Sequence, residues 1–260
     1  LGLSYKPFDN VELYSNISQN YRSITFSDMR VNNPSAQIDQ NLKDENGYSF
    51  DVGLRSNRAK FLNYDVSVFY LRYNNRIGEI QFRDAFMVLL LRRNIGAAAI
   101  RGVEAFAELS VLQLFPQKKE ETVLSVFGNV ALINSEYLST QAVGVEGNKL
   151  EFVPAVNTKA GLKLAFKNFK FSYQFTYLSD QFSDATNARE SGFSAIVGLI
   201  PAYAISDISM SYSYQRYKIE ASLNNAANRY YFTRRATGYP GPGILPSDGR
   251  SIYLSLQVKI

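Results

Sequence analysis

Eight arginines lie in or beside the long connections between the strand-like segments of this sequence, and they are the residues best suited to hold a small molecule. A guanidinium group presents its N–H donors in a flat fork, which matches the paired oxygens of a carboxylate or a phosphate. The chain therefore carries the chemistry needed to bind an anion, and Arg234 and Arg235 form the densest pair. The eight are Arg22, Arg30, Arg83, Arg92, Arg189, Arg229, Arg234 and Arg235.

The sequence contains no histidine and no cysteine. This composition excludes Ser-His-Asp triads, Cys-His pairs, disulfides, histidine-based zinc sites and histidine ligands to haem. Neighbouring acids such as Asp44 and Glu45 would point to opposite faces of a strand, so they are poorly placed for shared acid–base work. We expect no enzymatic activity, no cofactor and no metal site.

The charge balance argues against nucleic acid as a partner. The chain has 28 Lys and Arg against 23 Asp and Glu, a formal net charge of +5. These basic residues are spread over polar strand positions and loops, whereas nucleic-acid-binding proteins gather them on one element.

The elements that must position the arginines are strands with one apolar face. Residues 251–260 alternate apolar and polar side chains, as do residues 169–177 and 217–224. In lipid every backbone N–H and C=O needs a partner, so a sheet closes with its apolar face outward and its polar face around a lumen. No stretch approaches 18 uninterrupted apolar residues, so we expect a transmembrane antiparallel β-barrel without membrane helices.

The connections between the predicted strands alternate between short and long. Outer-membrane barrels have short periplasmic turns and long extracellular loops, and the two classes here each fall on one side. The segment 76–91 has no clear alternation and leaves three options open: barrel wall, an inward-folded loop or an extra strand. The predicted strands span residues 11–22, 47–57, 63–75, 86–112, 122–137, 151–166, 169–180, 203–215, 217–224 and 251–260.

Three stretches resemble the C-terminal part of the β-barrel of TonB-dependent outer-membrane receptors. Residues 93–104, with Asn94, Gly96 and the run Ile100 to Glu104, are similar to the family's "N-x-G … I-x-G-V-E" pattern. Residues 224–235, NNAANRYYFTRR, are similar to the segment before the final loop. Residues 238–250, with Gly-Tyr-Pro-Gly-Pro-Gly, Pro246 and Gly249-Arg250, resemble the ferric dicitrate receptor branch.

The resemblance implies the architecture and the partners. It predicts that residues 1–260 form a single partial barrel domain, with 10–11 of about 22 strands and without the plug and the TonB box. It implies import of a ferric citrate-like or siderophore chelate, energised by TonB, in the bacterial outer membrane. Outer-membrane lipid and lipopolysaccharide are further expected partners. One departure is Ile260, which stands where the family usually has an aromatic residue.

The resemblance also suggests roles for individual residues. The candidates for chelate binding are Arg92, Arg189, Arg229, Arg234, Arg235, Tyr230, Tyr231 and Tyr239. The alternative is that these arginines hydrate the loops or contact lipopolysaccharide phosphates. Alternation places Glu104 and Glu108 on the lumen side, where they either contact the plug or are hydrated wall residues.

Three other functions remain open from the sequence. A complete small barrel would act as a passive pore or a structural protein, and its first and last strands would pair. A small-barrel hydrolase is disfavoured by the missing histidine. A secreted β-sandwich could bind glycans through its tyrosines.

Overall fold

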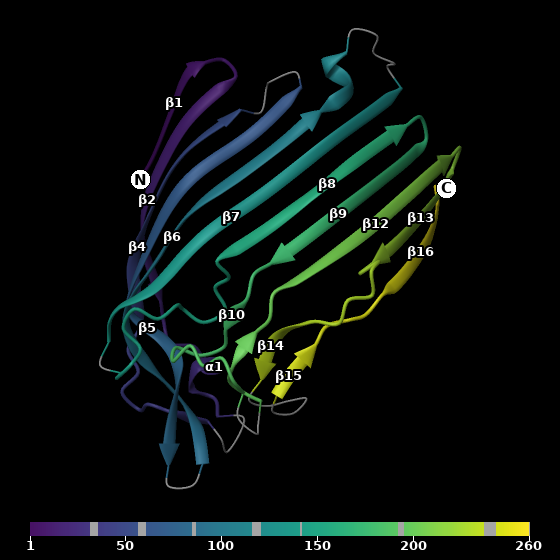
Figure 1. The fold of residues 1–260 in the computed structure, drawn as a ribbon. Helices are drawn as coiled ribbons and strands as arrows, with labels where there is room; N and C mark the ends of the chain where they lie inside the picture. Colours follow the sequence, from purple (N-terminus) through teal and green to yellow (C-terminus); the bar gives the residue numbers. More distant parts are fainter. Residues whose placement is uncertain are drawn as a thin grey trace.

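The computed structural model describes residues 1–31, 36–56, 61–84, 87–115, 121–140, 142–191, 195–236 and 243–259. The chain forms one large antiparallel sheet whose tilted strands curve like part of a barrel wall (Figure 1). The wall strands, in order across the sheet, are β1 (Gly2–Phe8), β2 (Val11–Arg22), β4 (Glu45–Ser56), β5 (Leu62–Asp84), β6 (Met87–Ser110), β7 (Thr122–Thr140), β8 (Val156–Phe166), β9 (Phe169–Leu178), β12 (Tyr203–Tyr214), β13 (Tyr217–Asn224) and β16 (Ser251–Val258).

Each wall strand pairs with the wall strand that follows it in the sequence, so the wall is a meander. This confirms the predicted antiparallel barrel wall of about 10–11 strands. Within the described residues β1 pairs with β2 and β16 pairs with β13, whereas β1 and β16 do not pair with each other. A closed small barrel would need that pairing. No described helix is long and apolar enough to cross a bilayer.

The two faces of the wall differ as the alternation predicted. On one face Met210 lies opposite Phe171, and Leu254 lies opposite Ala221. On the other face the hydroxyls of Ser172 and Ser209 lie 2.8 Å apart. The polar face encloses a hollow of about 940 Å³ lined largely by serine, lysine and glutamate side chains, so it is the concave side. The apolar face is therefore convex, as contact with hydrocarbon requires.

The short connections lie at one end of the wall and the long loops lie at the other. Tight turns join β1 to β2 and β8 to β9, and the described part of the β6–β7 connection contains a short 3-10 helix, η1 (Val111–Leu114). The long loops at the other end contain α1 (Phe26–Met29), β3 (Ala36–Ile38) and the pairs β10 (Gln181–Phe182) with β11 (Leu199–Ile200) and β14 (Phe232–Ala236) with β15 (Gly243–Pro246). In Figure 1, α1, β10, β14 and β15 gather at the end opposite the short turns.

Residues 76–84 of β5 and 87–91 of β6 stay paired beyond the wall as the arms of a hairpin, so this segment extends two strands, and the strand predicted at 63–75 ends too early. The register shifts between Tyr73, Arg76 and Ile77, opposite Gly96, and there the hairpin departs from the wall. Gly96 has φ +151°, and a Cβ on it would lie 2.0 Å from the carbonyl oxygen of Ser139. Beyond this point Ile80 and Ile95 pack against residues of the long loops, and the apolar–polar alternation disappears because lipid no longer lies on one side.

A small core holds the long-loop end together. It contains Ile80 and Ile95 from the hairpin, Tyr137 from β7, and Val145 and Leu150 from the loop after β7. Residues 151–155, predicted as the start of a strand, belong to that loop, and β8 begins at Val156. The long loops are therefore packed structures, and they fix the side chains that line the space between them.

Candidate binding site between the long loops

The long loops enclose a polar pocket of about 840 Å³ at the end of the wall. We call it the arginine pocket because six guanidinium side chains line it. Three carboxyl side chains also line it, so positive charge is in excess. The arginines are Arg22, Arg30, Arg76, Arg92, Arg234 and Arg235, and the acids are Asp28, Glu79 and Glu151.

Five of the eight arginines singled out in the sequence line this pocket. They come from three separate parts of the chain: the β2–β4 loop with its flanking strand end, the β5–β6 hairpin, and the β14–β15 pair. The prediction missed Arg76, which stands in a strand of the hairpin and not in an open loop. The long loops bring these arginines together, and no local sequence pattern links them.

The buried carboxylate of Glu45, which is not part of the pocket lining, holds two of the arginines in place. Its Oε1 accepts hydrogen bonds from Arg22 at 3.2 Å, from Arg76 at 2.9 Å and from the backbone N–H of Ile77 at 2.7 Å. Glu45 is 2% exposed. A buried charge of this kind is stable only when it is paired and hydrogen-bonded, so Glu45 holds both guanidinium groups in fixed positions.

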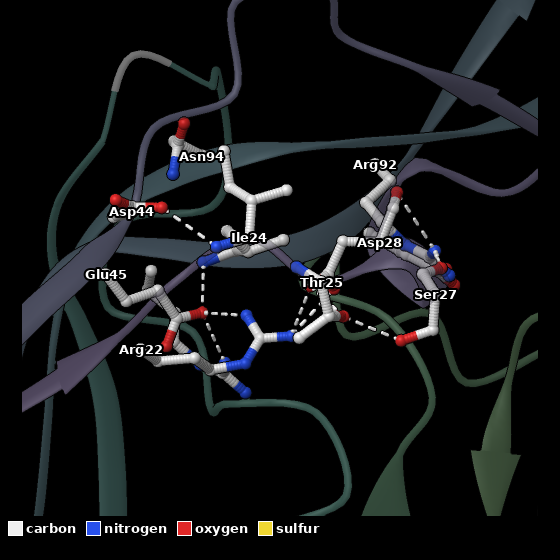
Figure 2. Close-up of polar contacts among 12 residues, drawn as sticks. Arg22, Ile24, Thr25, Ser27, Asp28, Asp44, Glu45, Arg92 and Asn94 are labelled. Atoms are coloured by element: carbon white, nitrogen blue, oxygen red, sulfur yellow. Dashed lines mark hydrogen bonds and ion pairs between the residues drawn. The ribbon is translucent and has the colours of Figure 1, made fainter.

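Asp28 holds the other side of Arg22, as Figure 2 shows. One terminal nitrogen of Arg22 contacts both carboxylate oxygens, at 2.7 and 2.8 Å, while Oδ2 also accepts from the N–H and the hydroxyl of Thr25. Burial alone would raise the pKa of Asp28, but the hydrogen bonds from Thr25 and Arg22 outweigh it and lower the pKa. Asp28 thus stays charged and orders the first turn of α1.

Arg92 joins the hairpin to the β2–β4 loop. It forms an ion pair of 2.6 Å with Glu79 and donates to the backbone carbonyl of Ser27 at 2.8 Å. Nearby, Asn94 bonds the backbone of Lys43 in both directions. The short strand β3 lies parallel to β6 beside these contacts. Together they fix the β2–β4 loop along one side of the pocket.

Arg235 and Arg234 play different parts, although the sequence suggested them as a pair. Arg235 donates to the carbonyls of Ala195 at 2.7 Å and Leu199 at 2.8 Å, and it lies over the Phe232 ring. Burial lowers the pKa of its guanidinium. Arg234 is exposed and forms no side-chain hydrogen bond or ion pair with described residues. Arg235 therefore ties two loops together, while Arg234 is open to a ligand.

Four other candidates lie outside the pocket lining. Arg189 is exposed, with its guanidinium 6.0 Å from the centre of the Phe182 ring. Arg229 bonds Asn225 through its backbone, and Tyr230 is 90% exposed. Tyr231 stacks on Tyr203 with ring centres 4.5 Å apart. Tyr239 and the side chain of Arg83 lie outside the part of the chain that the structure describes.

The floor of the pocket contains a buried acid that sequence reasoning missed. Glu151 accepts hydrogen bonds from the Tyr137 hydroxyl at 2.8 Å and from the N–H of Glu79 at 3.2 Å. Burial raises the pKa of Glu151 in spite of these bonds and the nearby Arg76. Gly78 makes room for it, because a Cβ there would lie 2.4 Å from Oε1. No period-2 signal marks Glu151, since it stands in a loop.

Glu104 and Glu108 both lie on the polar face of β6, away from the arginine pocket. Glu104 is exposed and stands opposite Ala131 in the sheet, whereas Glu108 forms an ion pair of 3.2 Å with Lys163. Glu108 also lines the concave hollow. Among the described residues no group of acidic side chains is arranged to hold a metal ion. The arginine pocket therefore suits an anion or an anionic complex, not a bare cation.

Comparisons with known proteins agree with this architecture. Residues 1–226 match the family model described as TonB dependent receptor-like, beta-barrel. The solved structure of the ferric citrate transporter FecA in its unliganded form superposes with a TM-score of 0.78 at 19% identity, over 99% of this chain and 37% of that one.

Two further solved structures cover 99% of this chain. The copper transporter OprC has a TM-score of 0.73 at 13% identity, and the ferric yersiniabactin uptake receptor FyuA from Yersinia pestis has 0.69 at 17%. The chain spans 38% and 36% of their lengths. At these identities the likeness shows the fold, and the family match adds the membership. The chain belongs to the TonB-dependent receptors, as part of their β-barrel in the bacterial outer membrane.

Proposed function

We propose that this chain is the part of a TonB-dependent receptor barrel that captures an anionic iron chelate, of the ferric citrate or siderophore kind, in the arginine pocket. The observation that carries the proposal is the convergence of six guanidinium groups around one pocket between the long loops. Guanidinium forks bind carboxylates in two-point fashion, so a ligand that presents several carboxylates matches the lining.

Three of the pocket arginines are already held in position before a ligand binds. Glu45 orients Arg22 and Arg76, and Glu79 orients Arg92, so the loss of side-chain entropy on binding is small. The exposed side chains of Arg30 and Arg234 add positive charge at the edge of the arginine pocket. The chain has neither histidine nor cysteine, so iron would arrive within its chelate and stay there.

Transport would use parts beyond these residues. In this proposal residues 1–260 form one portion of a single barrel domain, a plug closes the lumen, and TonB supplies the energy. Solved structures named for ferric citrate and ferric yersiniabactin share the fold, which favours an iron chelate as cargo. A structure named for copper shares it too, so the choice of cargo rests on the arginine pocket.

The test measures binding of ferric dicitrate by calorimetry to the full-length receptor. The variant Arg30→Gln with Arg234→Gln should weaken binding at least about tenfold, because each lost charged hydrogen bond costs about 1.5–3 kcal/mol. The matched control, Arg189→Gln with Arg229→Gln, removes two exposed loop arginines outside the pocket and should bind normally. Equal affinity of both variants would remove the arginine pocket as the capture site.

A further inference from the structure

Most of the excess positive charge in the sequence falls in the short connections and at the last residues. The five short connections and the end of the chain, residues 9–10, 57–61, 111–121, 167–168, 215–216 and 259–260, carry seven Lys or Arg against three Asp or Glu in the sequence. This excess of four is most of the formal net charge of the whole chain, +5. We call the end of the wall with the short turns the rim.

Two of these basic residues lie over aromatic rings of the convex, apolar face. The Lys167 ammonium is 5.6 Å from the centre of the Phe166 ring, and the Arg216 guanidinium is 5.5 Å from that of Tyr217. Phe166 stands opposite Phe169 in the sheet, which places it on the face that includes Met210. The two cations are thus at the membrane side of the rim.

A belt of aromatic residues connects the two positions. Phe169 stands opposite Tyr212, and Tyr214 stands opposite Tyr217 across the β12–β13 turn. Phe166, Tyr212, Tyr214 and Tyr217 are between 41% and 57% exposed. Aromatic belts of this kind mark the level of the lipid headgroups. Lys167 and Arg216 therefore lie where the phosphates of the periplasmic leaflet lie.

We propose that Lys167 and Arg216, in neighbouring turns of this rim, form a binding site for anionic phospholipid headgroups of the periplasmic leaflet. The acyl chains would lie against the aromatic belt while the phosphodiester pairs with the two cations. Among the described residues, Lys167 has one acidic neighbour, Glu121, at 3.5 Å. Both side chains of that pair are mostly exposed, at 59% and 67%, so the pair is weak and leaves Lys167 available.

The placement selects a lipid over a soluble anion or an acidic protein. A cation that projected from a turn into the periplasm would serve any acidic partner. Here the cations fold back over rings that face hydrocarbon, so a ligand with both an anionic group and acyl chains fits best. The lipid is identified by its phosphodiester headgroup and its negative charge.

The experiment uses the full-length receptor in lipid discs and measures, with spin-labelled lipids, its preference for phosphatidylglycerol over phosphatidylcholine. The variant Lys167→Gln with Arg216→Gln should lose up to about fivefold in this preference for each charge removed. The control, Lys159→Gln with Lys170→Gln, removes two exposed charges from the concave face of β8 and β9 and should keep it.

Two further arms make the outcome decisive. Heat-modifiable migration of each variant on a gel reports whether the barrel is folded, so a lost preference in a folded rim variant supports the site. Free glycerol phosphate should leave the preference unchanged. The lipid site would be overturned if the Lys167→Gln, Arg216→Gln variant kept the wild-type lipid preference, or if the control variant lost as much of that preference. It would also be overturned if free glycerol phosphate displaced the bound lipid.

Discussion

Glu79 and Arg92 stand directly opposite each other on the two arms of the β5–β6 hairpin, and their side chains form an ion pair of 2.6 Å. The same guanidinium reaches the backbone carbonyl of Ser27. One side chain thus links the hairpin to the β2–β4 loop, and both contacts line the arginine pocket.

Replacing Arg92 with Lys should loosen the β2–β4 loop while keeping the charge. A lysine ammonium lacks the flat fork that serves Glu79 and Ser27 at once, so we expect local opening to become easier by about 1–2 kcal/mol. Hydrogen exchange of residues 23–31 measures this. Arg101→Lys on the convex face is the matched control, and equal protection in both variants would show that Arg92 does not hold the loop.

Gly78→Ala should disturb the outer core. The new Cβ would lie 2.4 Å from Glu151 Oε1 and 3.0 Å from both the Ile95 side chain and the Tyr137 hydroxyl. Overpacking of this kind costs about 1–3 kcal/mol. Gly128→Ala is the control, because nothing lies within 4 Å of its added Cβ. Urea unfolding in lipid bilayers compares the two variants, and similar midpoints would contradict the predicted clash.

The loop that contains Glu151 should be more stable at acid pH. Because burial raises the folded pKa above its ordinary value of 4.5, the stabilisation is complete below that value and is lost as the pH rises through the raised pKa. Hydrogen exchange of residues 145–151, corrected for intrinsic rate, should show falling protection over this range. Glu151→Gln should remove the dependence, and an unchanged slope would assign it to another group.

Asn225→Ala should release the start of the last long loop. Its amide donates to the carbonyl of Arg229 at 2.8 Å, its oxygen accepts from the N–H of Arg229 at 2.9 Å, and its φ of 47° disfavours alanine. We expect a local cost of about 1–3 kcal/mol, measured by limited proteolysis of residues 225–236. The exposed neighbour Asn224→Ala should be cut at the wild-type rate; the same rate for Asn225→Ala would refute the anchor.

Lysine substitutions on the last wall strand should cost more stability on the convex face than on the concave face. Leu254 lies on the convex face, and Leu254→Lys should destabilise the barrel in bilayers by about 2–4 kcal/mol if placed near the midplane. Ser255 lies on the concave face, where Ser255→Lys should cost less than about 1 kcal/mol. Equal costs in urea titrations would mean that the convex face does not contact hydrocarbon.

Alternation predicted the wall because lipid and water act on opposite faces of the same strand. It placed β2 at residues 11–22, as found, and put β9, β12, β13 and β16 within about two residues of their bounds. It failed at residues 76–84 and 151–155, which lie beyond the wall, where side chains such as Ile80 pack into the small core of the long-loop end. Alternation of apolar and polar residues arises where lipid lies on one face of a strand and water on the other. It therefore does not predict strands in parts of the chain that lie beyond the membrane.

The sequence by itself determined the membrane wall, its strand order and the side that carries the long loops, since all three follow from local periodicity and loop length. Only the tertiary structure decided which arginines meet. It brought Arg92 and Arg234 into one pocket, added Arg76, and left Arg189 and Arg229 outside. These groupings depend on how loops far apart in the sequence pack around buried acids such as Glu45, and no local pattern encodes that packing.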